Sequence, residues 1–84
     1  MLRTTKVLIV GVGDGLSSSL AKLLYNEGMS ITLAARNVEK LENLKKEINA
    51  NVFKCNASSP NDVQNLFSEL DKIDEEPNFV IYNP

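Results

Sequence analysis

Short apolar runs alternate along this chain with longer segments in which apolar residues recur every three or four positions. The runs are rich in branched apolar residues and end at glycine, asparagine or other polar residues, a pattern typical of buried strands. We predict strands over Lys6–Val10, Ser30–Ala35, Asn51–Cys55 and Pro77–Tyr82.

The longer segments are predicted to be helices, because their apolar residues would share one face that can pack on a core. Gly28 is suited to end the first helix, and Asn37 is suited to cap the second. Ser59 is a good N-cap for the third helix, with Pro60 in its first position. The expected apolar faces consist of Leu16, Leu20, Leu23 and Leu24, then Val38, Leu41, Leu44 and Ile48, then Val63, Leu66, Phe67 and Leu70.

This alternation of strands and helices requires crossover connections, which make the strands parallel and place helices on both faces of the sheet. The predicted class is α/β with element order βαβαβαβ. Doubly wound connections give the strand order 3-2-1-4, which is half of a Rossmann fold. Because 84 residues suffice for one small domain, we expect residues 1–84 to form a partial Rossmann dinucleotide-binding domain.

A glycine-rich loop, Gly11-Val12-Gly13-Asp14-Gly15, joins the first strand to the first helix. A helix N-terminus offers unpaired backbone N–H groups and partial positive charge, and Gly13 and Gly15 would let a phosphate approach closely. Gly11 would allow the turn out of the strand. Asp14 would repel a phosphate unless it turns outward, and it could instead cap the helix. The alternative is that these glycines only form a tight turn.

The glycine spacing departs from the common dinucleotide fingerprint, because Leu16 occupies the position of its third glycine. The pattern here is Gly11, three residues, Gly15, one residue and the small residue Ser17. This spacing resembles that of the short-chain dehydrogenase/reductase family, which usually has glycine in place of Ser17. The resemblance continues, in the family's order, through Thr32–Asn37, Cys55–Pro60 and Val80–Asn83.

The resemblance implies a nicotinamide dinucleotide cofactor. Enzymes that use NAD commonly have an acid at the end of the second strand, where this chain has Ala35. The next residue, Arg36, could pair with a 2'-phosphate and stack on adenine, which favours NADP(H) over NAD. The alternative is that Arg36 is a solvated loop residue.

Other cofactor contacts are implied by position in the family pattern. Asn56 and Ala57 correspond to the pair that borders the adenine, although Asn56 could equally be a plain turn residue. Asn83 corresponds to an asparagine that supports the floor of the cofactor site. The expected cofactor-binding residues are therefore Gly11, Gly13, Asp14, Gly15, Leu16, Arg36, Asn56, Ala57 and Asn83.

The family's catalytic tyrosine, followed four residues later by lysine, has no counterpart in these residues. Met29 stands four residues after Tyr25, and no residue of this sequence stands four after Tyr82. We assign no catalytic residue and expect the catalytic half to lie beyond Pro84. The alternatives are a stand-alone nucleotide-binding or regulatory module and an inactive remnant. The fourth strand would then be an exposed edge, with apolar residues such as Phe79 and Ile81, and it could mediate self-association.

Composition narrows these expectations. The net charge of −2 leaves no basic patch for nucleic acid, and no apolar run approaches the length of a membrane helix. A single cysteine, Cys55, excludes an internal disulfide, and the absence of histidine leaves no plausible metal constellation. Cys55 is expected to be a buried strand residue. A cytoplasmic location fits these features best.

Overall fold

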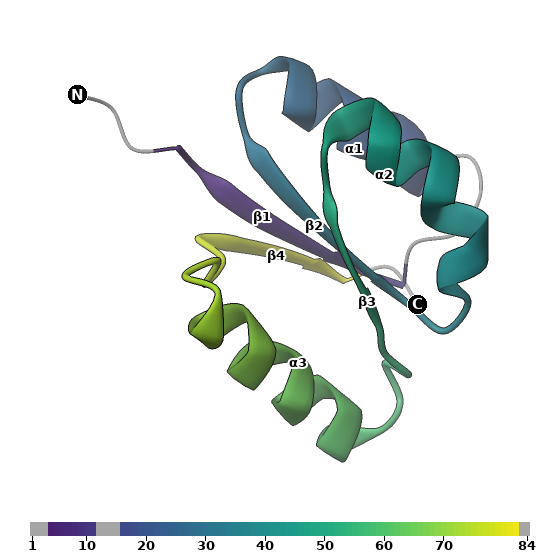
Figure 1. Ribbon diagram of the computed structural model, residues 1–84, viewed down its shortest axis with the longest axis vertical. Coiled ribbons are helices and arrows are strands. Elements are labelled where there is room, and N and C mark those ends of the chain that lie inside the picture. The colour runs from purple at the N-terminus through teal and green to yellow at the C-terminus, as the bar shows by residue number, and fades with distance from the viewer. Residues whose placement is uncertain (1–3, 12–15, 83–84) are drawn as a thin grey trace.

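The computed structural model describes residues 4–11 and 16–82, which form one sheet with helices on both faces (Figure 1). The elements are β1 (Lys6–Val10), α1 (Leu16–Asn26), β2 (Ser30–Ala35), the 3-10 helix η1 (Val38–Leu41), α2 (Glu42–Ile48), β3 (Asn51–Lys54), α3 (Pro60–Lys72) and β4 (Phe79–Tyr82). The predicted strands and helices are all present. The third strand ends one residue earlier than predicted, the fourth begins at Phe79, and the second helical segment opens with a 3-10 turn.

The four described strands are parallel and lie in the order β3-β2-β1-β4, which confirms the predicted order 3-2-1-4. Figure 1 shows α1 and α2 on one face of the sheet and α3 on the other. Because β1 has β2 on one side and β4 on the other, the direction of winding reverses at β1. Ligands of open α/β sheets bind beyond the carboxyl ends of the strands at such a reversal.

Two apolar layers hold the helices on the sheet, and alternate residues of each strand enter opposite layers. Val7, Ile31 and Leu33 lie in the layer covered by α1 and α2, together with Leu41 and Ile48. The layer under α3 contains Leu8, Val10, Ala34, Cys55, Leu66 and Leu70. Both faces of the central strands β1 and β2 are therefore buried, as their continuous apolar sequences predict.

The expected apolar faces of α1 and α3 include two side chains that are in fact exposed. Leu23 is 57% exposed and Phe67 is 39% exposed. In α3 the buried residues Leu66 and Leu70 are four apart, and Phe67 stands about 100° around the helix from Leu66. The same rotation places Leu23 away from Leu24, which packs on the core. Both helices therefore contact the sheet through a narrower face than their leucine pattern suggests.

The predicted helix boundaries are fixed by local hydrogen bonds. The Asn37 side chain accepts a hydrogen bond from the Glu39 N–H at 3.2 Å, at the start of η1. Gly28 follows α1 with φ +91°, a left-handed conformation that favours glycine. The Ser59 hydroxyl oxygen accepts from the Asp62 N–H at 3.4 Å, and Pro60 opens α3. The capping roles predicted for Asn37 and Ser59 are confirmed.

A Ser59→Ala variant should lower the free energy of unfolding by about 1 kcal/mol, because the first turn of α3 loses its cap. Urea unfolding followed by circular dichroism measures this change. Ser68→Ala, on the exposed side of α3, is the matched control and should change the free energy by less than about 0.5 kcal/mol. Equal effects of the two substitutions would contradict the capping role.

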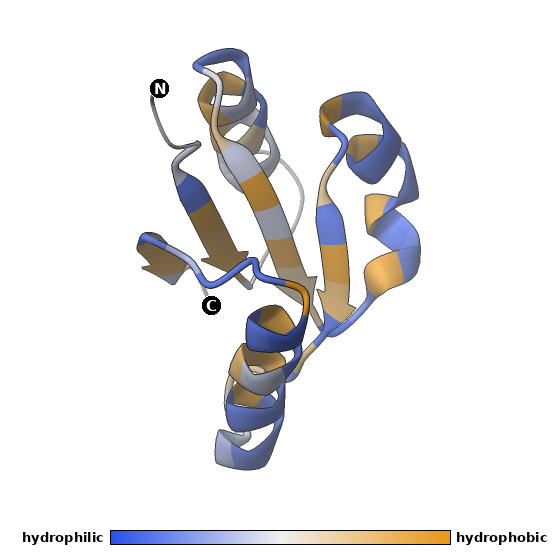
Figure 2. Cartoon of the chain, turned by 60° about the vertical axis from the view of Figure 1, so that its left-hand side comes forward, coloured by the Kyte–Doolittle hydropathy of each residue, from blue (hydrophilic) through white to orange (hydrophobic). Residues whose placement is uncertain are grey.

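The open side of the sheet is formed by β4, whose outer edge has no neighbouring strand within the described residues. Phe79, Val80 and Tyr82 are between 50% and 63% exposed. Figure 2 shows hydrophobic residues along this strand. The prediction that Phe79 is exposed is confirmed, whereas Ile81 is half-buried and packs against the layer under α1. None of the helices among the described residues is long and apolar enough to cross a membrane.

Candidate functional site

Three of the residues predicted from the sequence meet at the carboxyl edge of the sheet. Gly11 follows β1, Arg36 follows β2, and Asn56 lies two residues after β3. The strands are parallel and in register, with Val10 opposite Ala34 and Ala35 opposite Lys54, so their ends lie side by side. This edge is where an open α/β sheet binds its ligand.

Gly11 makes the turn out of β1. Its φ is +86°, in the left-handed region that side-chain-bearing residues rarely adopt, and its N–H donates to the Ala34 carbonyl oxygen at 2.8 Å. The hydrogen bond continues the pairing of β1 with β2 up to the start of the loop. Gly11 therefore makes the expected turn, and it does so through its left-handed backbone conformation.

A Gly11→Ala variant should lower the free energy of unfolding by about 1–2 kcal/mol, because a Cβ disfavours this left-handed conformation. Gly28→Ala is a useful control, since φ at Gly28 is +91° and a Cβ there would meet no atom within 4 Å. Both variants should lose stability in urea unfolding. If Gly11 borders the expected dinucleotide site, only Gly11→Ala should also weaken binding of the dinucleotide, and an effect of Gly28→Ala on that affinity would contradict a local role for Gly11.

Four of the expected contacts, Gly13, Asp14, Gly15 and Asn83, lie outside the described residues. Leu16 is the first residue of α1, so the helix begins directly after the glycine loop. Ser17 is only 4% exposed. A small side chain is thus buried at the position where the family pattern usually has glycine, which lets α1 lie close to the sheet.

Arg36 is exposed immediately after Ala35, which is 5% exposed at the end of β2. Within residues 4–11 and 16–82, no carboxylate forms an ion pair with the Arg36 guanidinium. The planar guanidinium N–H groups of Arg36 lie on the carboxyl side of the sheet, where they could donate hydrogen bonds to a doubly charged phosphate.

Asn56 has a turn role in the structure. Its side-chain oxygen accepts from the Ser58 N–H at 3.0 Å and from the Ser58 hydroxyl at 2.7 Å. The Asn56 N–H donates to Asp62 Oδ2 at 3.0 Å. Because both acceptor positions of the amide oxygen are used, an adenine amine would have to displace Ser58. The Tyr82 hydroxyl donates a long hydrogen bond, 3.5 Å, to the carbonyl oxygen of the half-buried Ala57.

Sequence reasoning missed the part that Asp62 plays at this edge. Asp62 is the third residue of α3, and its carboxylate reaches back to the loop that follows β3. An acid three residues after the capping Ser59 is a recognisable capping-box signal, which could have drawn attention to it. Here the carboxylate binds the Asn56 N–H and so holds the loop against α3.

Cys55 is buried, with 2% exposure, in the layer under α3. Burial raises the pKa of its thiol, and the nearby negative charge of Asp62 raises it further. The thiol therefore stays protonated near neutral pH. The predicted burial of Cys55 is confirmed, although Cys55 lies one residue after β3 rather than within the strand. Among the described residues, no three His, Cys, Asp or Glu side chains are grouped so as to hold a metal ion.

The sheet order, the reversal at β1 and the helix that follows a left-handed glycine define a Rossmann-like α/β domain. Residues 5–83 match the model of the short chain dehydrogenase family, and the chain belongs to this family. This assignment confirms the resemblance inferred from the glycine spacing and the later landmarks.

Similar curated proteins are oxidoreductases by name. The chain is 38% identical over 71 residues to an uncharacterized oxidoreductase from Staphylococcus aureus (strain USA300). It is 32% identical over 69 residues to the 3-oxoacyl-[acyl-carrier-protein] reductase FabG from Rickettsia conorii. These alignments cover 83% and 80% of this chain but 29% of each relative. The chain thus spans less than a third of the length of the relatives it matches.

Proposed function

We propose that this chain is the NADP(H)-binding N-terminal portion of a short-chain oxidoreductase whose catalytic half lies outside these 84 residues. The observation that supports the choice of NADP(H) is Arg36, which is exposed directly after β2 and has no ion-pair partner among the described residues. The acid expected for NAD binding is replaced by Ala35. On this proposal residues 1–84 act as a partial dinucleotide-binding domain in the cytoplasm.

The rest of the proposed site follows the carboxyl edge of the sheet. The loop from Gly11 through Gly13 and Gly15 to Leu16 would hold the pyrophosphate at the N-terminus of α1, with Asp14 turned toward the helix. Asn56 and Ala57 would border the adenine, and Asn83 would support the cofactor floor after β4. The left-handed turn at Gly11 and the direct start of α1 at Leu16 support this arrangement.

The bound cofactor would supply the hydride of a reduction or accept it in an oxidation. The residues of this chain would bind and orient the dinucleotide, and the proton-transfer groups would come from elsewhere. Neither tyrosine has a lysine four residues later, which supports the absence of the catalytic pair from this portion. The same observation favours a second candidate, a nucleotide-binding or regulatory module that acts with another polypeptide.

Calorimetric titration of the chain with NADPH, NADH and 2'-phospho-AMP tests the proposal. We expect saturable binding of NADPH and of 2'-phospho-AMP, both of which carry the 2'-phosphate. NADH lacks this phosphate and should bind at least about 10-fold more weakly. Absence of binding by all three ligands would refute the cofactor site. Equal affinity for NADPH and NADH would refute the role given to Arg36.

We further propose that β4 mediates self-association of the isolated chain, because its exposed apolar strand carries no charge that would oppose edge pairing. Sedimentation velocity should show a dimer that forms with increasing concentration. Val80→Lys should shift the population to monomer, whereas Asn43→Lys, which adds the same charge on the exposed surface of α2, should not. Dimerisation that is insensitive to Val80→Lys would contradict this role of β4.

A further inference from the structure

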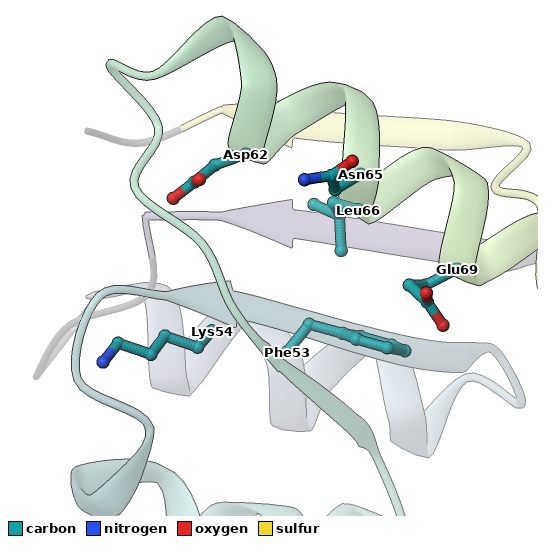
Figure 3. Close-up of a pocket in the computed structure, with 6 residues that line it drawn as sticks. All are labelled: Phe53, Lys54, Asp62, Asn65, Leu66 and Glu69. Carbon is teal, nitrogen blue, oxygen red and sulfur yellow. The ribbon is translucent and has the colours of Figure 1, made fainter.

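A hollow of about 310 Å³ lies between β3 and α3. Phe53 and Leu66 supply its apolar surface, while Asp62, Asn65 and Glu69 line the α3 side. Figure 3 shows Lys54 and Phe53 extending in opposite directions from β3. Lys54 also lines the hollow, so its charged groups are one ammonium on β3 and two carboxylates on α3, which leave the hollow with a net negative charge and a partly covered apolar surface.

The hollow adjoins an open strand edge. Within the described part of the chain, β3 pairs with β2 and with no other strand. The Cys55 N–H donates to the Ala35 carbonyl oxygen at 2.9 Å, so the backbone groups of Phe53, two residues earlier, also face β2. The N–H and C=O groups of Val52 and Lys54 consequently point outward. An extended segment could pair with them and add a fifth strand.

A strand in this position would place alternate side chains over the hollow. A central apolar side chain would lie against Phe53 and Leu66, in a volume at the lower end of the range for ligand pockets. The residues two positions before and after it would face α3 as well. Their positions are about 14 Å apart, since each residue of a strand advances about 3.4 Å.

The charges of α3 indicate which residues these flanking positions would carry. Asp62 and Glu69 are seven residues apart, or about 10 Å along the helix axis, which long basic side chains on the added strand could span. Among the described residues, Glu69 forms an ion pair only with the exposed Lys72, at 3.4 Å, and such a surface pair contributes little. Asp62 accepts the Asn56 N–H through one oxygen and can accept a cation through the other.

We propose that the edge of β3 and this hollow bind an extended polypeptide segment with a basic–x–apolar–x–basic sequence as an additional strand. Backbone hydrogen bonds to Val52 and Lys54 would align the bound segment with β3. The central apolar residue and the two basic residues would supply the selectivity, through Phe53, Asp62 and Glu69. The proposed contacts involve neither Arg36 nor the glycine loop, and the dinucleotide site is linked to them only through Asp62, which binds the Asn56 N–H.

The probe for this proposal is a fluorescein-labelled, end-blocked peptide Thr-Lys-Thr-Val-Thr-Lys-Thr, whose symmetric charge pattern suits either strand direction. Fluorescence anisotropy should show saturable binding to the full chain. The same peptide with glutamate in place of both lysines should bind about 4-fold or more weakly, because each exposed charge pair contributes up to about 1 kcal/mol. Equal binding of the two peptides would overturn the proposal.

Glu69→Lys should lower the affinity for the lysine peptide about 2- to 5-fold and raise the affinity for the glutamate peptide. The matched control is Glu76→Lys, an equal charge change at an exposed residue outside α3, which should alter neither affinity. Equal effects of the two protein variants would show attraction to net charge alone and would overturn the assignment to this hollow.

Backbone pairing is tested on the peptide, so that folding of the protein is not in question. N-methylation of the valine and N-methylation of the two threonines beside it remove N–H donors from opposite edges of the added strand. Strand addition predicts that one methylated peptide loses binding and the other retains it. Loss in both or in neither would overturn the proposal. Hydrogen exchange of the Val52 and Lys54 amides should slow when the unmodified peptide binds.

Discussion

An Arg36→Asp variant should reverse the preference for NADPH that is proposed for this chain. Loss of a bidentate, charge-assisted contact to the 2'-phosphate costs about 1.5–3 kcal/mol, so NADPH affinity should fall about 10- to 100-fold. The new carboxylate would follow β2, near the position from which an acid accepts hydrogen bonds from the ribose 2'-hydroxyl, so NADH should bind more tightly than it does to the unaltered chain. Calorimetric titration with both cofactors measures the reversal.

Two controls separate this effect from a general change of charge. Arg36→Gln should lose NADPH affinity without gaining NADH affinity, because an amide carries no positive charge. Lys46→Asp makes the same charge reversal on the exposed surface of α2 and should leave the preference unchanged. If Arg36→Asp behaves like Lys46→Asp, Arg36 is a solvated loop residue and the preference for NADP(H) has no basis.

The second large effect is expected in the core. Leu8 is fully buried in the central strand β1, in the layer under α3, so Leu8→Ala should lower the free energy of unfolding by about 2–5 kcal/mol. Small domains have little stability to lose, and the variant should be largely unfolded at room temperature. Urea unfolding and circular dichroism measure both quantities.

Leu23→Ala removes the same number of atoms from a residue that is 57% exposed and should change the free energy of unfolding by less than about 0.5 kcal/mol. A comparable loss for Leu8→Ala and Leu23→Ala would contradict the placement of the two leucines. It would restore the broader apolar face that the sequence suggested for α1.

The sequence predicts the strands well where they are continuous apolar runs. The bounds of β1 and β2 agree with prediction, because a strand buried on both faces needs no alternation and ends where polar residues or glycine begin. β3 and β4 lie at the two edges of the sheet and are shorter than predicted. At an edge, fewer neighbours hold the terminal residues, so a run of suitable residues need not pair over its whole length.

The helix faces were harder to predict, because leucine spacing does not show how much of each face the sheet can cover. Leu23 and Phe67 each follow the helical pattern yet are exposed, since each is adjacent in sequence to the residue that packs inward. The caps at Asn37 and Ser59 were predictable, because they depend on side chains within a few residues.

The candidate site was predictable in position rather than in detail. Parallel topology alone brings Gly11, Arg36 and Asn56 to one edge of the sheet. The engagement of Asn56 by Ser58 and Asp62 depends on the conformation of the loop after β3, which spacing does not reveal. The sequence left both an adenine contact and a turn role open for Asn56; the structure shows the turn role, and the adenine contact stays a proposal.

Titration of the isotopically labelled chain with NADPH, followed residue by residue by NMR, tests the cofactor site most directly. The proposed site predicts that the amide signals of Gly11, Leu16, Arg36 and Ala57 shift together with one dissociation constant. The signals of Val52, at the open edge of β3, and of Glu69, in the hollow beside α3, should not shift. Absence of shifts at the carboxyl ends of β1, β2 and β3, or shifts confined to Val52 and Glu69, would contradict the account.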